Sequence, residues 1–540
     1  MQLKSLTRRF AARLLEERGM TMMLALFTLT ITTLTLGGTY MAVLNDSHLS
    51  RNDLDQKRAY AAAQAGIQAY NYQLNQNENY WQTCATLGSS ASPITVPGST
   101  DAGGGTETYY VTPMVASTAP SNDNHCDTAN ALATMVEGSA AGTASGSFRI
   151  KSTGTSGNPA VSRTIIAQYK PPSFLDFVYY TDFETLDPVV IPGDPGDCAV
   201  HYPNRGGDCG SGINFITGDS INGPLHSEDT ISICGSPVFG RTAADAIEAP
   251  AYTNETGGNC SNSPTMIGTY NASATSITPP PDNSALLTVT QSAYHFTGKT
   301  TIVLNGSTMN VTNTAAGDNN TSVAWPSNGV IYVSTASGGC GVTYTPFNPS
   351  YSTDTNCGNV YVSGNYSQSL TIASDNDIVI NGSITTPVNG SGVPTGNALL
   401  GLIANDFVRI YHPVTGTRGN TNGDCNGSGQ TNVSNDTTNS LYNPKIYAAI
   451  LAVNHSFIVD NYDCGDESPA LGVLYVYGAI AQLFRGTVGK GGSGGASEGY
   501  TKSYNYDDRL ASEEPPYFLD PVSAQWFVSR ETECDSASTC

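Results

Sequence analysis

The residues best suited to bind a ligand lie in one polar loop. Four side chains with oxygen atoms alternate there before Gly427: Asn420, Asn422, Asp424 and Asn426. Alternate oxygen ligands that converge on one ion are typical of calcium sites, although the bidentate glutamate expected downstream is missing. We therefore expect a solvated polar loop and no cofactor, with a bound calcium ion at these four residues as the alternative. Residues 375–377, Asp-Asn-Asp, are a weaker second candidate.

No group of residues in the sequence supports catalysis. Cleavage of a glycosidic bond needs two carboxylates that flank the bond, and Asp507-Asp508 occurs without the partner motifs of such enzymes. The seven histidines are scattered, and no two have the spacing of metal ligands. Gly-x-Ser-x-Gly occurs around Ser493 and Ser497, but in a glycine-rich stretch that offers no strand and helix for a nucleophile elbow. We predict that the protein is not an enzyme.

The composition indicates an acidic protein rich in turns. The chain of 540 residues has a net charge of −22 and 56 glycines. A nucleic-acid-binding surface must be basic to meet phosphates, so we expect no nucleic-acid partner. Hydrophobic residues make up 39% of the chain, which is enough for a folded core. Abundant Gly, Asn, Ser and Thr favour short strands joined by turns over helices.

The cysteines indicate a compartment outside the cytoplasm. There are 12 of them, an even number, and none forms a CxxC pair. Cysteines spread through a polar, acidic chain are typical of disulfides in an oxidising environment, with buried free thiols as the alternative. We expect nearest-neighbour pairing: Cys84–Cys126, Cys198–Cys209, Cys234–Cys260, Cys340–Cys357, Cys425–Cys464 and Cys534–Cys540.

The N-terminus has the pattern of a membrane anchor. Residues 1–19 contain five basic and two acidic residues, and the 26 residues from Met20 to Asn45 contain no charge. About 20 apolar residues span a bilayer, and a positive flank stays cytoplasmic. The remainder of the chain should therefore face outward. An ordinary signal peptide fits poorly, because its apolar region is usually about 7–15 residues long.

The helical pattern continues beyond the apolar run. Apolar side chains repeat at helical spacing on one face: Tyr60, Ala63, Ile67, Tyr70 and Leu74. No proline occurs before Pro93, so one helix is expected from about Leu24 to Tyr80. Its first half would lie in the membrane, and its second half would be amphipathic.

These N-terminal residues resemble those of type IV pilin-like proteins. The basic leader ends in Glu17-Arg18-Gly19, and the stretch 57–67, KRAYAAAQAGI, is most similar to PilX-like minor pilins. The resemblance implies cleavage by a prepilin peptidase between Gly19 and Met20 and N-methylation of the new terminus. It also implies assembly with other pilin-like subunits through the apolar helix residues Leu24, Leu26, Phe27, Leu29, Ile31, Leu34 and Leu36. Leu24 replaces the glutamate usual in major pilins, which favours a minor subunit.

The remainder of the chain is predicted to be mainly β. Short apolar segments recur after about residue 174, separated by Asn-Gly and Asp-Asn turns, as in 370–384. Unalternated runs such as 448–452 favour buried parallel strands, so we expect a right-handed parallel β-helix, with an antiparallel sandwich or barrel as the alternative. The predicted domains are a leader (1–19), a pilin-like helix (20–80), a small α/β or β head (81–170), the β-helix-like body (174–490) and a capping tail (491–540).

The sequence thus predicts a minor pilus or pseudopilus component that displays a large β-domain at the cell surface for adhesion or binding. Its expected partners are the cytoplasmic membrane, a prepilin peptidase, other pilin-like subunits and a surface glycan or host ligand. Two alternatives stay open at this point. One is a membrane-tethered carbohydrate-active β-helix enzyme, and the other is a passive cell-wall or sheath protein.

Overall fold

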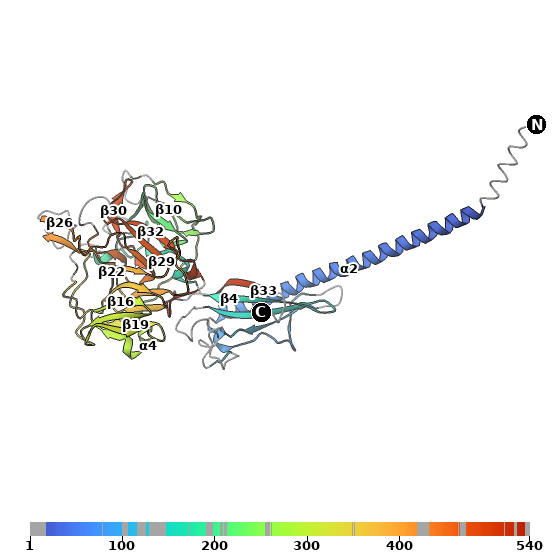
Figure 1. Ribbon diagram of the computed structural model, residues 1–540, viewed down its shortest axis with the longest axis horizontal. Helices are drawn as coiled ribbons and strands as arrows, with labels where there is room; N and C mark the ends of the chain where they lie inside the picture. The colour runs from blue at the N-terminus through green and yellow to red at the C-terminus, as the bar shows by residue number, and fades with distance from the viewer. Residues whose placement is uncertain are drawn as a thin grey trace, which may run out of the picture.

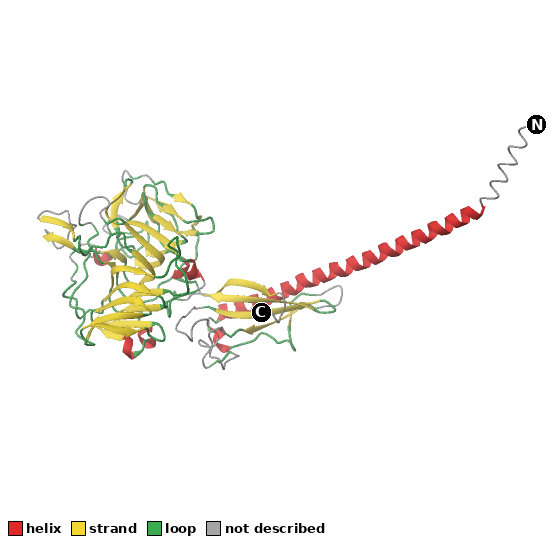
Figure 2. Cartoon of the chain, in the orientation of Figure 1, coloured by secondary structure: helices red, strands yellow, loops and turns green. Residues whose placement is uncertain are grey.

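The computed structural model describes most of the chain. The described residues are 18–77, 79–99, 106–115, 126–128, 135, 147–170, 172–190, 198–205, 209, 213–253, 260, 262–347, 349, 351–417, 431–462, 464, 471–511, 513–522 and 526–534. They form a long helix, a small head against its C-terminal half, and a larger β-rich body beyond the head (Figure 1). The mainly β prediction is confirmed, with the helix at the N-terminal side (Figure 2).

The helix α2 (Arg18–Gln76) has 59 residues, which corresponds to a length of about 90 Å. It begins earlier and ends earlier than the predicted range of Leu24 to Tyr80. The helix stops before Asn77, and the chain then enters a short 3₁₀ turn, η1 (Tyr80–Thr83). The N-terminal part of α2 projects away from the rest of the protein (Figure 1).

The head is a five-stranded antiparallel sheet. Its strands follow the order β1 (Ile94–Thr95), β2 (Thr108–Pro113), β3 (Phe148–Ser156), β4 (Val161–Lys170) and β33 (Phe527–Cys534). The fifth strand comes from the C-terminal part of the chain, and its Phe527 pairs with Lys170 at the end of β4. The body is therefore an insertion between two neighbouring strands of the head.

The C-terminal half of α2 packs very closely on this sheet. Ala63, Ile67, Tyr70 and Leu74 are 0–3% exposed, as their helical spacing predicts. The Ser152 hydroxyl on β3 donates to the carbonyl of Ala63 at 2.7 Å, and the Tyr169 hydroxyl on β4 donates to the carbonyl of Ile67 at 3.0 Å. Small residues permit this approach, because no side chain separates the helix backbone from the strand at Gly154.

The body is built on one 21-stranded sheet in which most neighbouring strands are parallel. Its longest column of parallel strands has one order: β15 (His295–Thr297), β19 (Val330–Ser334), β21 (Leu370–Ser374), β23 (Leu400–Ala404), β27 (Lys445–Ala452), β29 (Val473–Phe484), β5 (Tyr179–Phe183), β8 (Leu225–Ser227), β11 (Ala246–Glu248) and β14 (Thr269–Asn271). The residues of β21 and β23 are all buried, which explains their unalternated apolar sequences.

The order of this column does not follow the chain. The chain enters in the middle at β5 and proceeds to β14 at one end. It then continues from β15 at the other end and returns to the middle, where Ile480 of β29 pairs with Tyr179 of β5. The stacked parallel strands agree with the predicted architecture. A simple solenoid, however, would follow the chain order and would lack the antiparallel strands β17 and β18. A right-handed β-helix as such stays a prediction.

Other strands extend the stack or decorate it. Those of the main sheet are β7 (Ser220–Asn222), β10 (Val238–Phe239), β13 (Thr265–Met266), β16 (Thr300–Gly306), β17 (Thr308–Asn313), β18 (Asp318–Ala324), β20 (Val360–Tyr366), β22 (Ile378–Thr385), β24 (Val408–Ile410), β28 (Phe457–Val459) and β32 (Thr501–Tyr506). Smaller sheets contain β6 (Asn214–Ile216), β9 (Ile231–Cys234) and β12 (Tyr252–Thr253), then β25 (Val414–Thr417) with β26 (Thr431–Asn435), and β30 (Gly489–Gly492) with β31 (Gly495–Gly499).

Short helical segments connect these strands. They are η3 (Phe174–Asp176), η4 (Pro188–Val190), α4 (Ala285–Val289), η5 (Ser292–Tyr294) and η6 (Asp508–Ala511).

The C-terminal region differs from the predicted capping tail at 491–540. Within the described part of that range, β32 lies inside the main sheet, and β33 completes the head. Backbone pairing explains this outcome: β33 supplies hydrogen-bond partners for the outer N–H and C=O groups of β4. The glycine-rich stretch around Ser493 is an antiparallel hairpin, β30–β31, with no nucleophile elbow.

Four disulfides lie among the described residues, and all four match nearest-neighbour pairing: Cys84–Cys126, Cys198–Cys209, Cys234–Cys260 and Cys340–Cys357. Cys464 and Cys534 are also disulfide-bonded. Their expected partners, Cys425 and Cys540, lie outside the described residues. The disulfides fit a protein folded in an oxidising compartment.

Candidate functional site: the exposed apolar helix

The most distinctive surface of the protein is the N-terminal part of α2. The 20 residues from Met22 to Met41 are long and apolar enough to cross a membrane, and none of them is buried. The side chains predicted to make assembly contacts are 45–76% exposed: Leu24, Leu26, Phe27, Leu29, Ile31, Leu34 and Leu36. An exposed apolar surface of this size is typical of a segment that contacts lipid or other helices.

Threonine hydroxyls of this segment are satisfied within the helix itself. Five threonine hydroxyls donate to the carbonyl four residues earlier at 2.7–2.9 Å: Thr28, Thr30, Thr32, Thr33 and Thr35. A hydroxyl bonded in this way presents mainly its methyl group outward and leaves no unpaired donor. These five threonines can therefore enter an apolar environment without an unsatisfied hydroxyl donor.

A polar collar separates the apolar segment from the head. Lys57 pairs with Asp53 at 2.8 Å on the helix surface. Nearer the sheet, the Arg163 guanidinium donates to Gln56 at 2.7 Å, and the Gln64 amide donates to Glu531 of β33 at 2.6 Å. The C-terminal strand thus contacts the helix as well as the sheet, and it links the anchor, the head and the return from the body.

The other predicted site residues have different outcomes. The backbones of Gly19 and Met20 lie in the first turn of α2, and nothing in the structure tests their processing. The predicted calcium ligands Asn420, Asn422, Asp424 and Asn426 lie outside the described residues. At the second calcium candidate, Asp377 binds Arg409 instead of offering its carboxylate to an ion. Among the described residues, no group of three His, Cys, Asp or Glu side chains is arranged to hold a metal.

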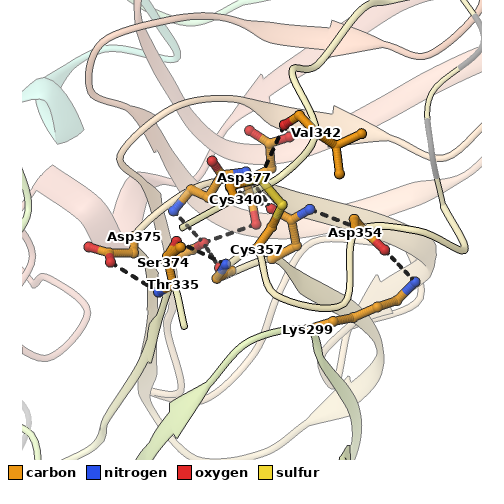
Figure 3. The surroundings of a disulfide bond; sticks show 12 residues. Lys299, Thr335, Cys340, Val342, Asp354, Cys357, Ser374, Asp375 and Asp377 are labelled. Carbon is orange, nitrogen blue, oxygen red and sulfur yellow. Dashed lines mark hydrogen bonds and ion pairs between the residues drawn. A yellow bond between two sulfur atoms is a disulfide. The ribbon is translucent and has the colours of Figure 1, made fainter. Parts of the chain in front are cut away.

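Arg409 connects three consecutive layers of the body. It lies on β24, between β22 and β28. Its guanidinium donates to Asp377 at 2.7 Å, before β22, and to Asp460 at 3.0 Å, after β28. All three side chains are at most 5% exposed. Figure 3 shows Asp377 beside the Cys340–Cys357 disulfide, with Lys299 bound to Asp354 nearby.

The cavity beside this network is only about 20 Å³ in volume, which is too small for an organic ligand. The Arg409 network is therefore a structural element. The sequence offered one signal for it, because Arg409 interrupts the apolar strand 407–410, and a charge there requires partners.

A second group of charges, the corner cluster, consists of Asp187, Asp406 and His455. The imidazole Nδ1 of His455 lies 2.8 Å from Asp187, and its Nε2 lies 3.9 Å from Asp406. Burial, with the nearby charge of Asp377, raises the pKa of Asp406 to about 6. Burial alone would lower the pKa of His455, but the hydrogen bond and the charge of Asp187 outweigh it, and the pKa of His455 is raised.

The corner cluster should make the body less stable as the pH rises. The folded protein holds a proton on Asp406 up to about pH 6, whereas an unfolded aspartate loses it near pH 3.9, so stability falls between these values. His455, with a raised pKa, loses its contribution as the pH passes its folded pKa. Asp406→Asn should raise the free energy of unfolding at pH 8 by on the order of 1 kcal/mol and change little at pH 4.

Urea unfolding of the wild type and of Asp406→Asn at both pH values measures this difference. Asp508→Asn is the control, because Asp508 is 76% exposed and should show no such pH-dependent gain. Equal effects of Asp406→Asn at pH 4 and pH 8 would contradict the assignment.

A larger cavity lies where the head meets the body. Its volume is about 780 Å³, and both connectors between the two parts line it. Pro172 and Phe177 lie on the outgoing connector, Val522 lies on the returning one, and Phe527 is the first residue of β33. The lining is mainly apolar and also includes the carboxylates Asp176 and Glu248, which bind Lys170 and His226 within the protein.

No family model matches the chain, and no curated protein matches its sequence. Among solved structures, the chain is similar to the crystal structure of the competence-associated pilin ComZ from Thermus thermophilus. The TM-score is 0.27 at 12% sequence identity, and the alignment covers 88% of this chain and 97% of that chain. A score this low does not establish a shared fold. The features established here are one exposed apolar helix, a β-rich body and a set of disulfides, which are compatible with an anchored extracellular protein.

Proposed function

We propose that the protein is a minor component of a type IV pilus or pseudopilus. The observation that carries this proposal is the two-part helix α2. One part, Met22–Met41, is apolar and exposed on all sides, and the other part is buried against the head sheet. A plain membrane anchor needs only the first part. In a pilin-like subunit, one half of a continuous helix packs on the globular head, and the exposed half packs among the equivalent helices of other subunits.

The processing step follows from the resemblance at residues 17–20. In this proposal a prepilin peptidase cleaves between Gly19 and Met20, and the new N-terminus is methylated. The helix then leaves the bilayer and joins other pilin-like subunits. The body is displayed at the cell surface for adhesion or binding, and no catalytic role is assigned to it. The absence of a charge at Leu24 and the bulk of the body both favour a low-copy position over the fibre shaft.

Intact mass and N-terminal sequencing of the protein from native membranes and from sheared pilus fractions test this proposal. A chain that begins at N-methylated Met20 and is present in the pilus fraction is the expected result. A chain that begins at Met1 and stays in the membrane would overturn it. The protein would then be a tethered surface protein, and a search for glycan binding or cleavage would follow.

A charge in the exposed helix should abolish anchoring and assembly together. Ile31 lies near the middle of Met22–Met41, where an aspartate costs about 2.5–3.5 kcal/mol on insertion. We expect Ile31→Asp to reduce the membrane-bound fraction at least tenfold and to be absent from pilus fractions, as measured by immunoblot of separated fractions. The control is Leu287→Asp on α4 of the body, where Leu287 is already 38% exposed. Normal membrane recovery of Ile31→Asp would show that this segment is not the anchor.

A further inference from the structure

The stack of the body has a seam where strands from opposite ends of the chain meet. β32 lies between β29 on one side and β7 on the other. Across the seam, Tyr504 of β32 pairs with Ile221 of β7. In chain order, the seam joins the last strand of the main sheet to one of its first strands. Hydrogen bonds and side-chain packing stabilise it.

One buried lysine–aspartate pair spans this seam. Lys502 of β32 and Asp219, next to β7, are separated by 283 positions in the sequence, and the Lys502 Nζ lies 2.8 Å from the Asp219 Oδ2. The two side chains are 3% and 0% exposed. The corresponding pair Lys299–Asp354 is nearly as close, at 2.9 Å, but Lys299 is 26% exposed. The seam pair therefore combines close contact with almost complete exclusion of water.

Backbone donors hold both oxygens of the Asp219 carboxyl group. The Ile216 N–H donates to Oδ2 at 3.0 Å, and the Lys502 N–H donates to Oδ1 at 3.1 Å. These bonds fix the carboxyl group beside the lysine amine, which contacts its Oδ2. They are also positioned to stabilise negative charge on either oxygen if a nucleophile adds to the carbon between them.

The surroundings of the pair favour an uncharged amine. Burial lowers the pKa of Lys502; Asp219 opposes this effect, and the nearby guanidinium of Arg485 reinforces it. Arg485 is held in place by Glu184 at 2.6 Å and lies 3.7 Å above the ring of Phe215. An ammonium beside a second buried cation is disfavoured, whereas a neutral amine is a nucleophile.

We propose that Lys502 and Asp219 condense to an isopeptide bond that covalently closes the seam. Within the pair, one proton passes from the Lys502 ammonium to the Asp219 carboxylate across their hydrogen bond. The freed lone pair of the amine then attacks Cγ of Asp219, and the Nζ–Cγ bond forms. The Cγ–O bond to the hydroxyl group breaks, and that hydroxyl leaves with one amine proton as water. The products are one amide and one water, so the step requires no oxidant, reductant or other co-reactant.

Such a bond would tie the end of the β-stack to its beginning. Without it, the seam can open by separation of β32 from β7, because each strand is joined there only through non-covalent contacts. With it, the strands from β7 to β32 form a closed covalent loop. This arrangement suits a body exposed at the cell surface to proteases and mechanical load, whether or not the protein is a pilus component.

Mass spectrometry of the full-length protein after complete reduction tests the proposal. We expect a mass about 18 Da below that of the reduced chain, which is one water, and a branched peptide that contains both Lys502 and Asp219 after proteolysis. Lys502→Arg should restore the full mass, and Lys299→Arg, at the more exposed pair, should retain the loss. Asp219→Asn should lose about 17 Da instead, because ammonia would replace water as the leaving group.

An unmodified mass for the wild-type protein would overturn the proposal and leave a buried ion pair at the seam. The same loss of mass without a branched peptide would also overturn it, because cyclisation of an aspartate within its own backbone removes water too. The intact mass and the peptide analysis are both measured on the wild-type protein, so these two outcomes do not depend on the folding of any variant.

Discussion

Gly154→Ala should prevent stable packing of α2 on the head. A Cβ at position 154 would lie 2.1 Å from the carbonyl oxygen of Ala59 and 2.3 Å from the amide nitrogen of Ala63. Both atoms belong to the helix backbone, so no side-chain rotation relieves the overlap, and the helix must move away from β3. We expect a loss of about 3 kcal/mol in the stability of the head, since overpacking of a close contact costs about 1–3 kcal/mol or more. Thermal unfolding and limited proteolysis between α2 and β2 measure it.

The matched control is Gly37→Ala in the exposed part of the same helix. Nothing lies within 4 Å of a Cβ at Gly37, so the same chemical change should leave the head intact. If Gly154→Ala unfolded at the same temperature as this control, the close contact between helix and sheet would not exist in solution. Because both variants leave the body unchanged, the body transition serves as an internal reference.

Arg409→Met should produce the largest loss of stability in the body. The substitution keeps much of the side-chain volume but leaves Asp377 and Asp460 without their cation in a buried environment. Removal of one partner from a buried ion pair typically costs about 3–5 kcal/mol. Urea unfolding of the body at pH 7 measures the effect. Lys57→Met is the control, because Lys57 and Asp53 are 72% and 64% exposed and such pairs contribute about 0–1 kcal/mol.

The loss caused by Arg409→Met should shrink at acid pH. Burial raises the pKa of Asp377 even in the wild type, where Arg409 opposes the shift. Without the arginine, the folded protein should bind a proton on this carboxyl more tightly than the unfolded chain does, so protonation favours folding. A loss that is equal at pH 4 and pH 7 would indicate that lost packing, not unpaired charge, is responsible.

Much of the anchor could be read from local patterns in the sequence. The uncharged run after Gly19 and the helical spacing of apolar residues depend only on neighbours along one helix. The structure contains the run and buries the predicted face from Ala63 to Leu74, but Tyr60, the first residue of that face, is 37% exposed. The four described disulfides also match nearest-neighbour pairing, because cysteines close in sequence lie on adjacent turns of the chain. The predicted calcium loop at 420–426 stays a prediction.

The pairing of distant strands could not be read in this way. The sequence of β33 shows apolar and polar residues but contains no sign that its partner is β4, over 350 positions earlier in the chain. The backbone N–H and C=O groups that join two strands are nearly the same in every residue. The sequence of a strand therefore does not specify its pairing partner. For this reason the places of β32 and β33, which the sequence analysis assigned to a capping tail, and of β29 beside β5 were not foreseen.

Local sequence patterns were therefore sufficient for the long apolar helix, the mainly β character and the neighbouring disulfides, because hydrophobic length, helical period and cysteine spacing act over short distances. Three features depend on the folded chain: the body is inserted into the head, Arg409 joins three layers, and Lys502 meets Asp219 at the seam. Each of these features brings together residues from distant parts of the chain. Burial then makes their charges costly unless they are paired, and this condition arises only after the chain has folded.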